Sequence, residues 1–248
     1  MNIFNSIKKS LCVMAFGLVV VVVQGCATGP NVNPADPMEP LNRAVFNFND
    51  GLDRAVLRPV ATAYDQVTPS PVKTGVRNFF GNITDVWSVV NNLLQFKIKE
   101  SLETFMRVSV NSTFGFGGVL DIGTEMRLAK NKQDFGQTLG VWGFDTGPYV
   151  VLPLFGPSSV RDTIGRVVDG SADLVNNSRN VPARNSLVTL RVVDKRAEVL
   201  GSTNLLDQAA LDKYSFTRDL YLQRRIVSTD KDPAVKEERF DLPEAPAK

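Results

Sequence analysis

The 248-residue sequence contains no histidine and only two cysteines, Cys12 and Cys26. The absence of histidine excludes Ser-His-Asp and Cys-His catalysis, histidine-ligated zinc, copper or non-haem iron, and a histidine pH switch. Sequence motifs of other catalytic and binding classes are also missing: there is no Gly-x-Ser-x-Gly elbow, no phosphate-binding GK[ST] loop and no D-x-D-x-D-G calcium loop. We therefore expect a protein that is not an enzyme, with no catalytic residue, no metal site and no cofactor.

Excess charge of one sign is lacking as well. The formal net charge of +2 depends on Lys8 and Lys9, because removal of residues 1–25 leaves 26 basic against 26 acidic side chains. A neutral chain without a long basic run offers no electrostatic basis for nucleic-acid binding. Nucleic acid is therefore not an expected partner.

No apolar run is long enough to cross a membrane. The longest, residues 11–23, has 13 uncharged residues, whereas a span needs roughly 20. It follows Lys8-Lys9 and precedes Val23-Gln24-Gly25-Cys26, an order typical of an export signal. The last four residues resemble the lipobox of bacterial lipoproteins, which predicts cleavage after Gly25 and acylation of Cys26. This covalent lipid is the only attached group that we expect.

Two alternatives to a lipoprotein signal are an ordinary signal peptide that is followed by a cysteine by chance, and an uncleaved segment that is retained as an anchor. With Cys12 removed in the signal, Cys26 is the only cysteine of the mature chain, so no internal disulfide can form. Two or three acyl chains on one residue would hold the protein on a membrane firmly. By resemblance to other bacterial lipoproteins, Ala27 after the cysteine favours the outer membrane.

Composition divides the chain into four parts. Residues 1–25 form the signal peptide, and the Pro-rich residues 26–40 form an extended, lipidated tether. A helical domain is expected over residues 36–227. Residues 228–248 carry many charges and three prolines without apolar periodicity, which predicts a disordered tail.

Helical periodicity dominates the predicted domain. Leu41, Val45, Phe48, Leu52 and Val56 recur at steps of three or four, predicting a helix that Pro59 ends. Further periodic faces predict additional helices over residues 72–80, 86–94, 98–110, 183–200, 203–212 and 215–227.

The sequence thus predicts a mainly α single domain whose helices are 10–18 residues long, too short to span a bilayer singly. Their apolar faces could lie within one membrane leaflet or could pack inward in a soluble bundle. Periodicity alone favours the bundle.

The middle of the chain departs from this pattern, because residues 115–170 hold 11 of the 18 glycines. Residues 114–118 and 147–157 are both apolar and turn-rich. Two interpretations remain open: buried connections, or loops that contact lipid or line an apolar passage. Ser159-Val160-Arg161-Asp162 fits the pattern of a helix capping box. Alternatively, Arg161 and Asp162 form a polar pair at the mouth of an apolar cavity.

Several segments, in order, resemble the MlaA/VacJ family of outer-membrane lipoproteins. The first is the signature Asp36-Pro37-Met38-Glu39-Pro40-Leu41-Asn42-Arg43 with Phe46-Asn47. The others are Asn78–Asn82 (NFFGN), Val90–Gln95 (VNNLLQ), Asp134–Gly140 (DFGQTLG), Gly147-Pro148-Tyr149 with Leu152-Pro153, Gly156-Pro157-Ser158 with Arg161-Asp162, and Asp212-Lys213-Tyr214 with Arg218–Arg225 (RDLYLQRR).

This resemblance implies a ring-like helical body that lies in the inner leaflet, with a central amphipathic channel and a trimeric porin alongside. It implies a role in the Mla pathway, which keeps the outer membrane asymmetric by passing mislocalised phospholipids to a periplasmic carrier of the MlaC type. The lipid-anchored chain would lie on the periplasmic face of the outer membrane. The alternatives are a structural scaffold lipoprotein and, less favoured without histidine, a phospholipase.

Three groups of site residues follow from composition and resemblance. Channel or lipid-path candidates are Gly147, Pro148, Tyr149, Leu152, Pro153, Gly156, Arg161 and Asp162. Candidates for a mobile hairpin are Phe114, Gly115, Phe116, Gly117 and Gly118. Family-motif residues expected to be structural are Asp36, Pro37, Glu39, Asn42, Arg43 and Asn47, and the amides of Asn78, Asn82, Asn91, Asn92 and Gln95 are interpreted in the same way. Contact with the lipid head group is the alternative for the amides and for Arg43.

Overall fold

The computed structural model describes residues 33–228, so the predicted signal peptide, Cys26, most of the tether and residues 229–248 lie outside the described residues. The predicted mainly α class is confirmed. The elements, in chain order, are α2 (Glu39–Leu52), the π-helix η1 (Asp53–Leu57), α3 (Arg58–Val67), α4 (Ser70–Leu94), α5 (Ile98–Thr113), α6 (Ile122–Glu125), α7 (Phe135–Val141), β1 (Tyr149–Leu152), β2 (Gly156–Ser159), α8 (Val160–Ala172), α9 (Val181–Glu198), α10 (Leu200–Ala209) and α11 (Lys213–Ser228).

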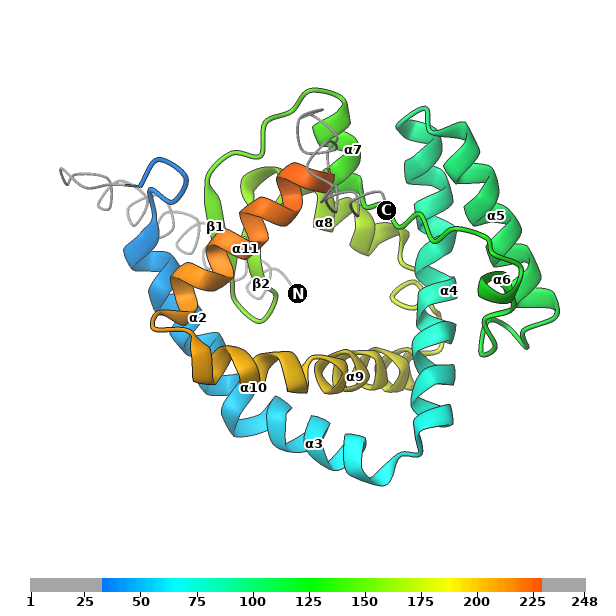
Figure 1. The fold of residues 1–248 in the computed structure, drawn as a ribbon, viewed down its shortest axis with the longest axis horizontal. Helices are drawn as coiled ribbons and strands as arrows, with labels where there is room; N and C mark the ends of the chain where they lie inside the picture. The colour runs from blue at the N-terminus through cyan, green and yellow to red at the C-terminus, as the bar shows by residue number, and fades with distance from the viewer. Residues whose placement is uncertain (1–32, 229–248) are drawn as a thin grey trace, which may run out of the picture.

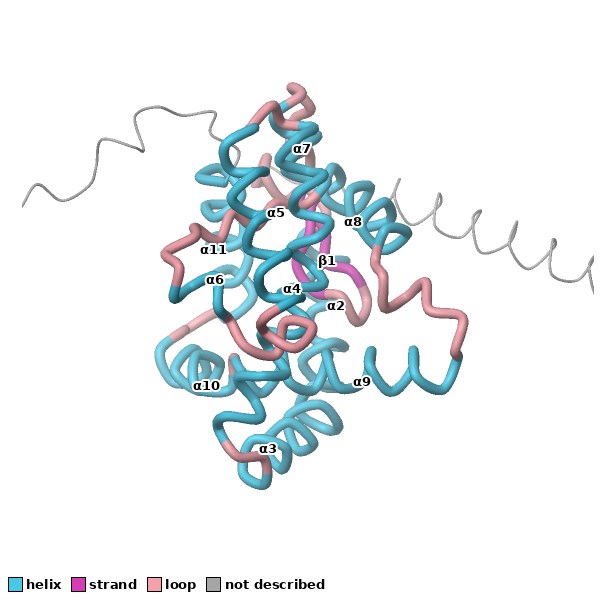
Figure 2. The backbone as a smooth tube through the Cα atoms, turned by 90° about the vertical axis from the view of Figure 1, so that its right-hand side faces the viewer, coloured by secondary structure: helices cyan, strands magenta, loops and turns pink. Residues whose placement is uncertain are grey.

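The helices are arranged in a ring (Figure 1). α2, α3, α9 and α10 form one part of it, α4 forms a second, and α7, α8, α11 and the β1–β2 hairpin form the third. α3 packs on α9, α7 packs on α8, and α5 packs on α4. Figure 2 shows α5 in front of α4 when that side faces the viewer, so α5 lies outside the ring.

The first helical segment does not end at Pro59. α2, η1 and α3 follow one another without a break, and the Arg58 N–H bonds back to the Asp53 carbonyl across the wider π turn. Proline lacks an N–H and clashes with the carbonyl four residues earlier, so it disrupts a regular α-helix. A π turn placed before Pro59 opens the ladder there, and the chain continues as a helix to Val67.

α4 is longer than any helix the sequence predicts. It runs for 25 residues and joins two segments expected to be separate, which at about 1.5 Å per residue gives a rod of roughly 37 Å. Its length does not make it a membrane span: within residues 33–228, no helix combines the length and apolar character that crossing a bilayer requires. The three predicted C-terminal helices correspond to α9, α10 and α11.

The packing of α4 on α5 is polar inside and apolar outside. α5 buries Ser101, Thr104, Arg107 and Asn111, whereas its apolar face is about half exposed, at Ile98, Leu102, Phe105 and Met106. α4 likewise buries its polar residues, namely Asn82, Asp85, Ser88, Asn91 and Asn92. The inward apolar faces that periodicity alone favoured are therefore not found here: the apolar face of α5 is exposed, while Asn82 donates to Ser112 and Ser101 donates to the Val89 carbonyl across the two helices.

A small apolar core lies under the β1–β2 hairpin. The strands pair antiparallel, with Tyr149 opposite Ser159. The rings of Tyr149 and Tyr214 meet edge to face, and the ring of Phe46 meets Tyr214 in the same way. This core fixes the hairpin between α2 and α11.

Candidate functional site

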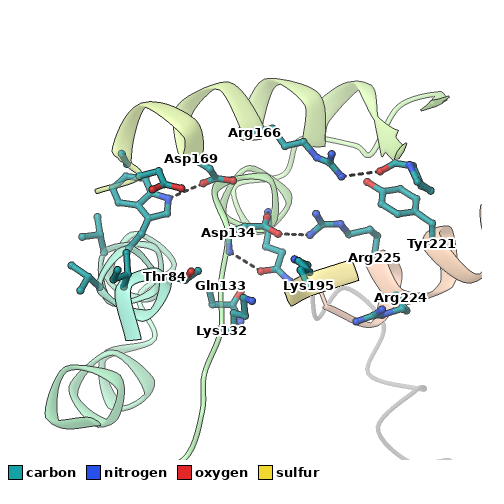
Figure 3. A pocket seen from close by; sticks show the side chains of 18 of the residues that line it. Thr84, Lys132, Gln133, Asp134, Arg166, Asp169, Lys195, Tyr221, Arg224 and Arg225 are labelled. Atoms are coloured by element: carbon teal, nitrogen blue, oxygen red, sulfur yellow. Dashed lines mark hydrogen bonds and ion pairs between the residues drawn. The ribbon is translucent and has the colours of Figure 1, made fainter. Parts of the chain in front are cut away.

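A cavity of about 940 Å³ lies within the ring, at the upper end of the range of ligand-binding cavities. Its walls come from α4, α7, α8, α9 and α11 and from the loop before α7 (Figure 3). The lining residues are Ile83, Thr84, Val86, Trp87, Val90, Lys132, Gln133, Asp134, Gln137, Pro157, Arg166, Asp169, Ala172, Asp173, Leu174, Lys195, Thr217, Leu220, Tyr221, Arg224 and Arg225.

One wall is apolar and is formed by a single helix. Ile83, Val86, Trp87 and Val90 recur at steps of three, one and three along α4, which places them on one face. α4 also buries polar residues, of which Asn82 donates to Ser112 of α5, and Ser88 and Asn92 donate to carbonyls of the loop before α7. The apolar residues that line the cavity are therefore distinct from the polar residues through which α4 binds its neighbours.

The wall made by α7 and α8 is held by carboxylates. Asp134 begins α7 in a full capping box, accepting from the Gln137 N–H at 2.8 Å while Gln137 accepts from the Asp134 N–H at 2.9 Å. Asp169 of α8 accepts from Trp87 Nε1 at 2.7 Å and from the Phe135 N–H at 3.0 Å. Burial raises the pKa of Asp169, opposed by these two hydrogen bonds. Asp169 thus ties α4 and α7 to α8.

A second carboxylate of α8, that of Asp162, joins this helix to α11. Arg225 Nε lies 2.8 Å from Asp162 Oδ2, and the Tyr221 hydroxyl donates to the same oxygen. Arg225 also lies 2.7 Å from Asp134. Burial raises the pKa of Tyr221, and the hydrogen bond to Asp162 raises it further. Since Tyr221 and Arg225 line the cavity, the buried Asp162 positions the α11 wall from behind.

Arg166 anchors the hairpin to the cavity. Its guanidinium donates to the carbonyls of Phe155 at 3.2 Å and Pro157 at 2.8 Å. Leu154, Phe155 and Phe144 are all more than half exposed, whereas Tyr149 and Val151 are buried. The apolar middle region therefore contains both of the structures left open by the sequence: buried connections and exposed apolar loops.

The eight channel candidates lie together behind the cavity. Gly147 and Pro148 precede β1, Tyr149 and Leu152 lie in it, Pro153 follows it, Gly156 begins β2, and Arg161 and Asp162 lie in the first turn of α8. None of the eight lines the cavity found in the described residues, although Pro157 from the same segment does. Their place on a lipid path stays a prediction.

Arg161 and Asp162 are both buried and lie 3.1 Å apart, Nε to Oδ1. Ser159 caps α8 by accepting from the Asp162 N–H at 3.2 Å, as the capping pattern predicts. The pair is thus part of a helix start, and Asp162 reaches the cavity only through Tyr221 and Arg225.

The hairpin candidates form the connection between α5 and α6. Phe114 and Phe116 are exposed, whereas Gly115 and Gly118 are tightly enclosed: a Cβ on Gly118 would lie 2.5 Å from Asn82 Cβ. The mobility of this segment stays a prediction.

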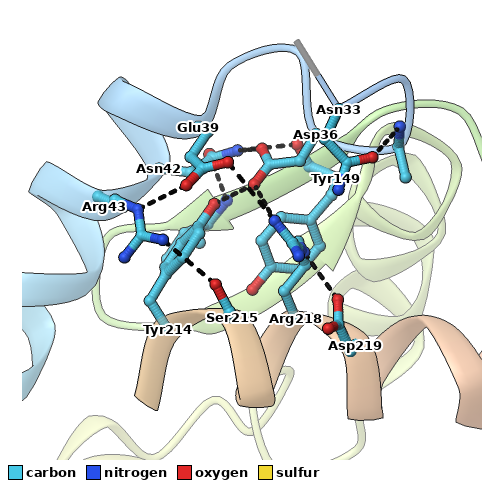
Figure 4. A network of polar contacts seen from close by, with 12 residues as sticks. Asn33, Asp36, Glu39, Asn42, Arg43, Tyr149, Tyr214, Ser215, Arg218 and Asp219 are labelled. Carbon is cyan, nitrogen blue, oxygen red and sulfur yellow. Dashed lines mark hydrogen bonds and ion pairs between the residues drawn. The ribbon is translucent and has the colours of Figure 1, made fainter. Parts of the chain in front are cut away.

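The family-motif residues form a polar network beside the hairpin core (Figure 4). Asp36 is buried and accepts from Asn42 Nδ2 at 2.8 Å and from the Tyr214 hydroxyl. Arg43 lies 2.7 Å from Asp212 and 2.7 Å from Glu39. This network joins the start of α2 to α11, so the two ends of the described chain close the ring.

The amides of α4 also make internal hydrogen bonds. Asn78 donates to the Val119 carbonyl, Asn82 to Ser112, Asn91 to the Trp87 carbonyl, Asn92 to the carbonyls of Ser88 and Asn131, and Gln95 to Thr138 and Gln133. None of these amides lines the cavity found in residues 33–228. Asn47 is exposed on α2, and Pro37 lies in the turn before that helix.

Most of the residues that line the cavity were not predicted from the sequence. The repeat of Val86 and Val90 identifies a helical face but not the side of the ring on which it lies. Lys195 and Asp169 belong to no motif, and Arg224 and Arg225 stand in a family segment without an assigned role. Only the ring closure, which depends on contacts between distant segments, brings these residues together.

Three comparisons place the chain among known proteins. The family model described as MlaA lipoprotein matches residues 34–227. The chain is 34% identical over 223 residues to the "Intermembrane phospholipid transport system lipoprotein MlaA" of Escherichia coli (strain K12), covering 88% of this chain and 87% of that one. It is 32% identical over 225 residues to the protein of the same name from Haemophilus influenzae, covering 87% and 89%.

A solved structure reported under the heading "Structural basis for maintenance of bacterial outer membrane lipid asymmetry" superposes with a TM-score of 0.69 at 32% identity. The match covers 79% of this chain and 99% of that one. The family resemblance noted in the sequence is therefore confirmed by both sequence and fold. The chain belongs to the MlaA lipoprotein family.

Proposed function

We propose that the chain is a lipid-anchored component of a phospholipid-transport system and carries phospholipids through the ring cavity. It removes mislocalised phospholipids from the outer leaflet of the outer membrane and so maintains lipid asymmetry. The names of its relatives support this role. The observation that carries the proposal is the cavity itself, which combines an apolar wall on α4 with cationic side chains on α9 and α11.

The outer surface supports a place within one leaflet. Apolar side chains of α5 and α3 are exposed and do not line the cavity, among them Phe105, Met106, Val60 and Val67. An extensive apolar surface of this kind is characteristic of contact with lipid. Because the backbone hydrogen bonds of a helix are satisfied within it, these helices can lie among the lipids of one leaflet without spanning the bilayer.

The transport step in this proposal is passive and breaks no bond. The acyl chains lie against Ile83, Val86 and Val90 while the head group meets the charged residues opposite. The lipid then leaves to a periplasmic carrier of the MlaC type. A trimeric porin beside the ring, and anchoring on the periplasmic face of the outer membrane through acylated Cys26, complete the proposal.

Photo-crosslinking in cells tests the passage. A photoreactive phenylalanine analogue replaces Leu220 on the cavity wall or Phe105 on the outer face of α5, and crosslinked phospholipid is measured by mass spectrometry. We expect lipid on both positions. Lipid on Phe105 but none on Leu220 would contradict a passage and favour the scaffold alternative.

A second experiment tests the anchor. Cys26→Ala, expressed at the wild-type level, should leave the chain unable to reverse the rise in surface-exposed phospholipid in cells that lack it. Full reversal by Cys26→Ala would contradict the need for the acyl anchor.

A further inference from the structure

The charge around the cavity is unbalanced. Its lining contains five basic and three acidic side chains, namely Lys132, Arg166, Lys195, Arg224 and Arg225 against Asp134, Asp169 and Asp173. The balance between them depends on which of these groups already have partners within the protein.

All three carboxylates have protein partners. Asp134 is paired with Arg225 at 2.7 Å, and Asp173 is paired at 2.6 Å with Arg191, which lies outside the lining. Asp169 accepts from Trp87 and Phe135, and burial raises its pKa. Asp134 and Asp173 are therefore already paired with arginines, whereas the two donors to Asp169 are uncharged.

Four of the cations lack a carboxylate partner within residues 33–228: Lys132, Arg166, Lys195 and Arg224. Arg166 donates to two backbone carbonyls, which carry no net charge. Lys132, Lys195 and Arg224 are solvent-exposed within the cavity wall (Figure 3). Partial desolvation of the Lys195 ammonium lowers its pKa, and the positive charge of Lys132 lowers it further. An anion placed among these groups would favour the charged ammonium and so oppose this lowering.

We propose that the cavity selects phospholipids whose head group carries a net negative charge, such as phosphatidylglycerol, over zwitterionic ones such as phosphatidylethanolamine. This inference rests on the proposed function and names its preferred substrate class. Both lipids present a phosphate to the unpaired cations. Only the zwitterionic head group also brings an ammonium toward Lys132, Lys195 and Arg224, where like charges repel.

The size of the preference is modest, because these side chains are partly solvated and water screens them. One additional charge interaction at such a site corresponds to an enrichment of about three- to fivefold. The enrichment falls as salt concentration rises, since the Debye length shrinks from about 10 Å at 0.1 M to 3 Å at 1 M.

The test uses the full acylated chain reconstituted in vesicles of equal phosphatidylethanolamine and phosphatidylglycerol content. The protein is re-isolated in mild detergent, and its bound lipids are quantified by mass spectrometry. We expect the bound ratio to exceed the vesicle ratio by about three- to fivefold in favour of phosphatidylglycerol at low salt. Lys195→Gln and Arg224→Gln should each reduce this enrichment, and the double variant should bring it close to the vesicle ratio.

Lys99→Gln is the matched control. Lys99 lies on α5 outside the cavity with 84% of its side chain exposed, and its substitution makes the same change in net charge. It should retain the wild-type enrichment. Bound lipid at the vesicle ratio in the wild type, or an equal loss of enrichment in Lys99→Gln and Lys195→Gln, would overturn the selectivity while leaving the transport role intact. A protein that retains no lipid at all would overturn the proposed function, and the selectivity with it.

Discussion

Asn42 on α2 completes the backbone hydrogen bonding of strand β1, 107 residues away. Its Nδ2 donates to the Tyr149 carbonyl at 3.0 Å, and its Oδ1 accepts from the Val151 N–H at 2.9 Å. Asn49, two turns later, repeats the arrangement with the Leu152 carbonyl and the Leu154 N–H. Two amides therefore take the place of a neighbouring strand and attach the hairpin to α2.

Asn42→Ala should lower the free energy of unfolding by about 2–3 kcal/mol, because it leaves a buried carbonyl and a buried N–H without partners. Asn47→Ala is the control, since Asn47 is exposed on the same helix, and it should change stability by less than about 0.5 kcal/mol. Denaturation of the detergent-solubilised protein measures both. Equal effects of the two substitutions would contradict the role given to Asn42.

A close approach between glycines sets the spacing of α7 and α8. A Cβ on Gly165 would lie 2.5 Å from the Gly136 nitrogen, and the obstacle is backbone that cannot rotate away. Gly165→Ala should therefore destabilise the protein by about 1–3 kcal/mol. Gly170→Ala lies on the same helix, where a Cβ meets nothing within 4 Å, and should be neutral or slightly stabilising. The melting temperatures of both variants test this prediction. A Gly165→Ala variant as stable as the wild type would show that α8 can shift away from α7.

Phe96 holds a left-handed backbone conformation, with φ at 59°, directly after the C-cap of α4. A side chain with a Cβ is strained in this region, whereas glycine is not. Phe96→Gly should raise the free energy of unfolding by about 1 kcal/mol. Phe96→Ala removes the same exposed ring but keeps the Cβ, so it should not give this gain. Similar melting temperatures for the two variants would contradict the strain.

Asp207 on α10 joins Arg58 and Lys213, with oxygen–nitrogen distances of 2.5 and 2.6 Å. The hydrogen bond to Arg58 and then that to Lys213 lower the pKa of Asp207 from 3.8 to about 2. A carboxylate with a lowered pKa stabilises the folded state above its unfolded pKa and loses this contribution as the pH falls through its folded value.

Asp207→Asn should therefore be less stable than the wild type at pH 7, by about 1 kcal/mol after solvent screening. The difference should shrink as the pH falls from about 4 to about 2. Melting curves across this range test the prediction. A difference that stays constant with pH would mean that the carboxylate charge does not contribute.

The sequence predicted the helical class, the C-terminal helices and the helix start at Ser159, because each depends on local periodicity or capping. It did not predict the continuous helix through Pro59, because the π turn that lets the chain continue there leaves no signal in the apolar periodicity. Periodicity taken alone also favoured inward apolar faces. Periodicity identifies a face but not its surroundings, and here Arg107 and Asn111 are buried while Phe105 is exposed.

For the site, apolar and glycine-rich composition indicated residues 147–162, yet the cavity wall comes mainly from α4, α8 and α11. Trp87, Asp169 and Lys195 lie far apart in sequence, and only the closed ring brings them together. The segment indicated by the sequence supports that wall from behind, through the bond from Tyr221 to Asp162.

The most direct test of phospholipid passage fills the cavity. Phospholipid exposed in the outer leaflet is measured in cells that lack the chain. The cells are restored with wild type, with Val90→Trp plus Leu220→Trp on the cavity wall, or with Val60→Trp plus Val67→Trp at exposed positions of α3 that do not line the cavity. Equal protein levels and melting temperatures establish that the variants fold. Wild type and the α3 variant should lower the exposed phospholipid, and the cavity variant should not. Equal restoration by the cavity-filled variant would contradict passage through the ring.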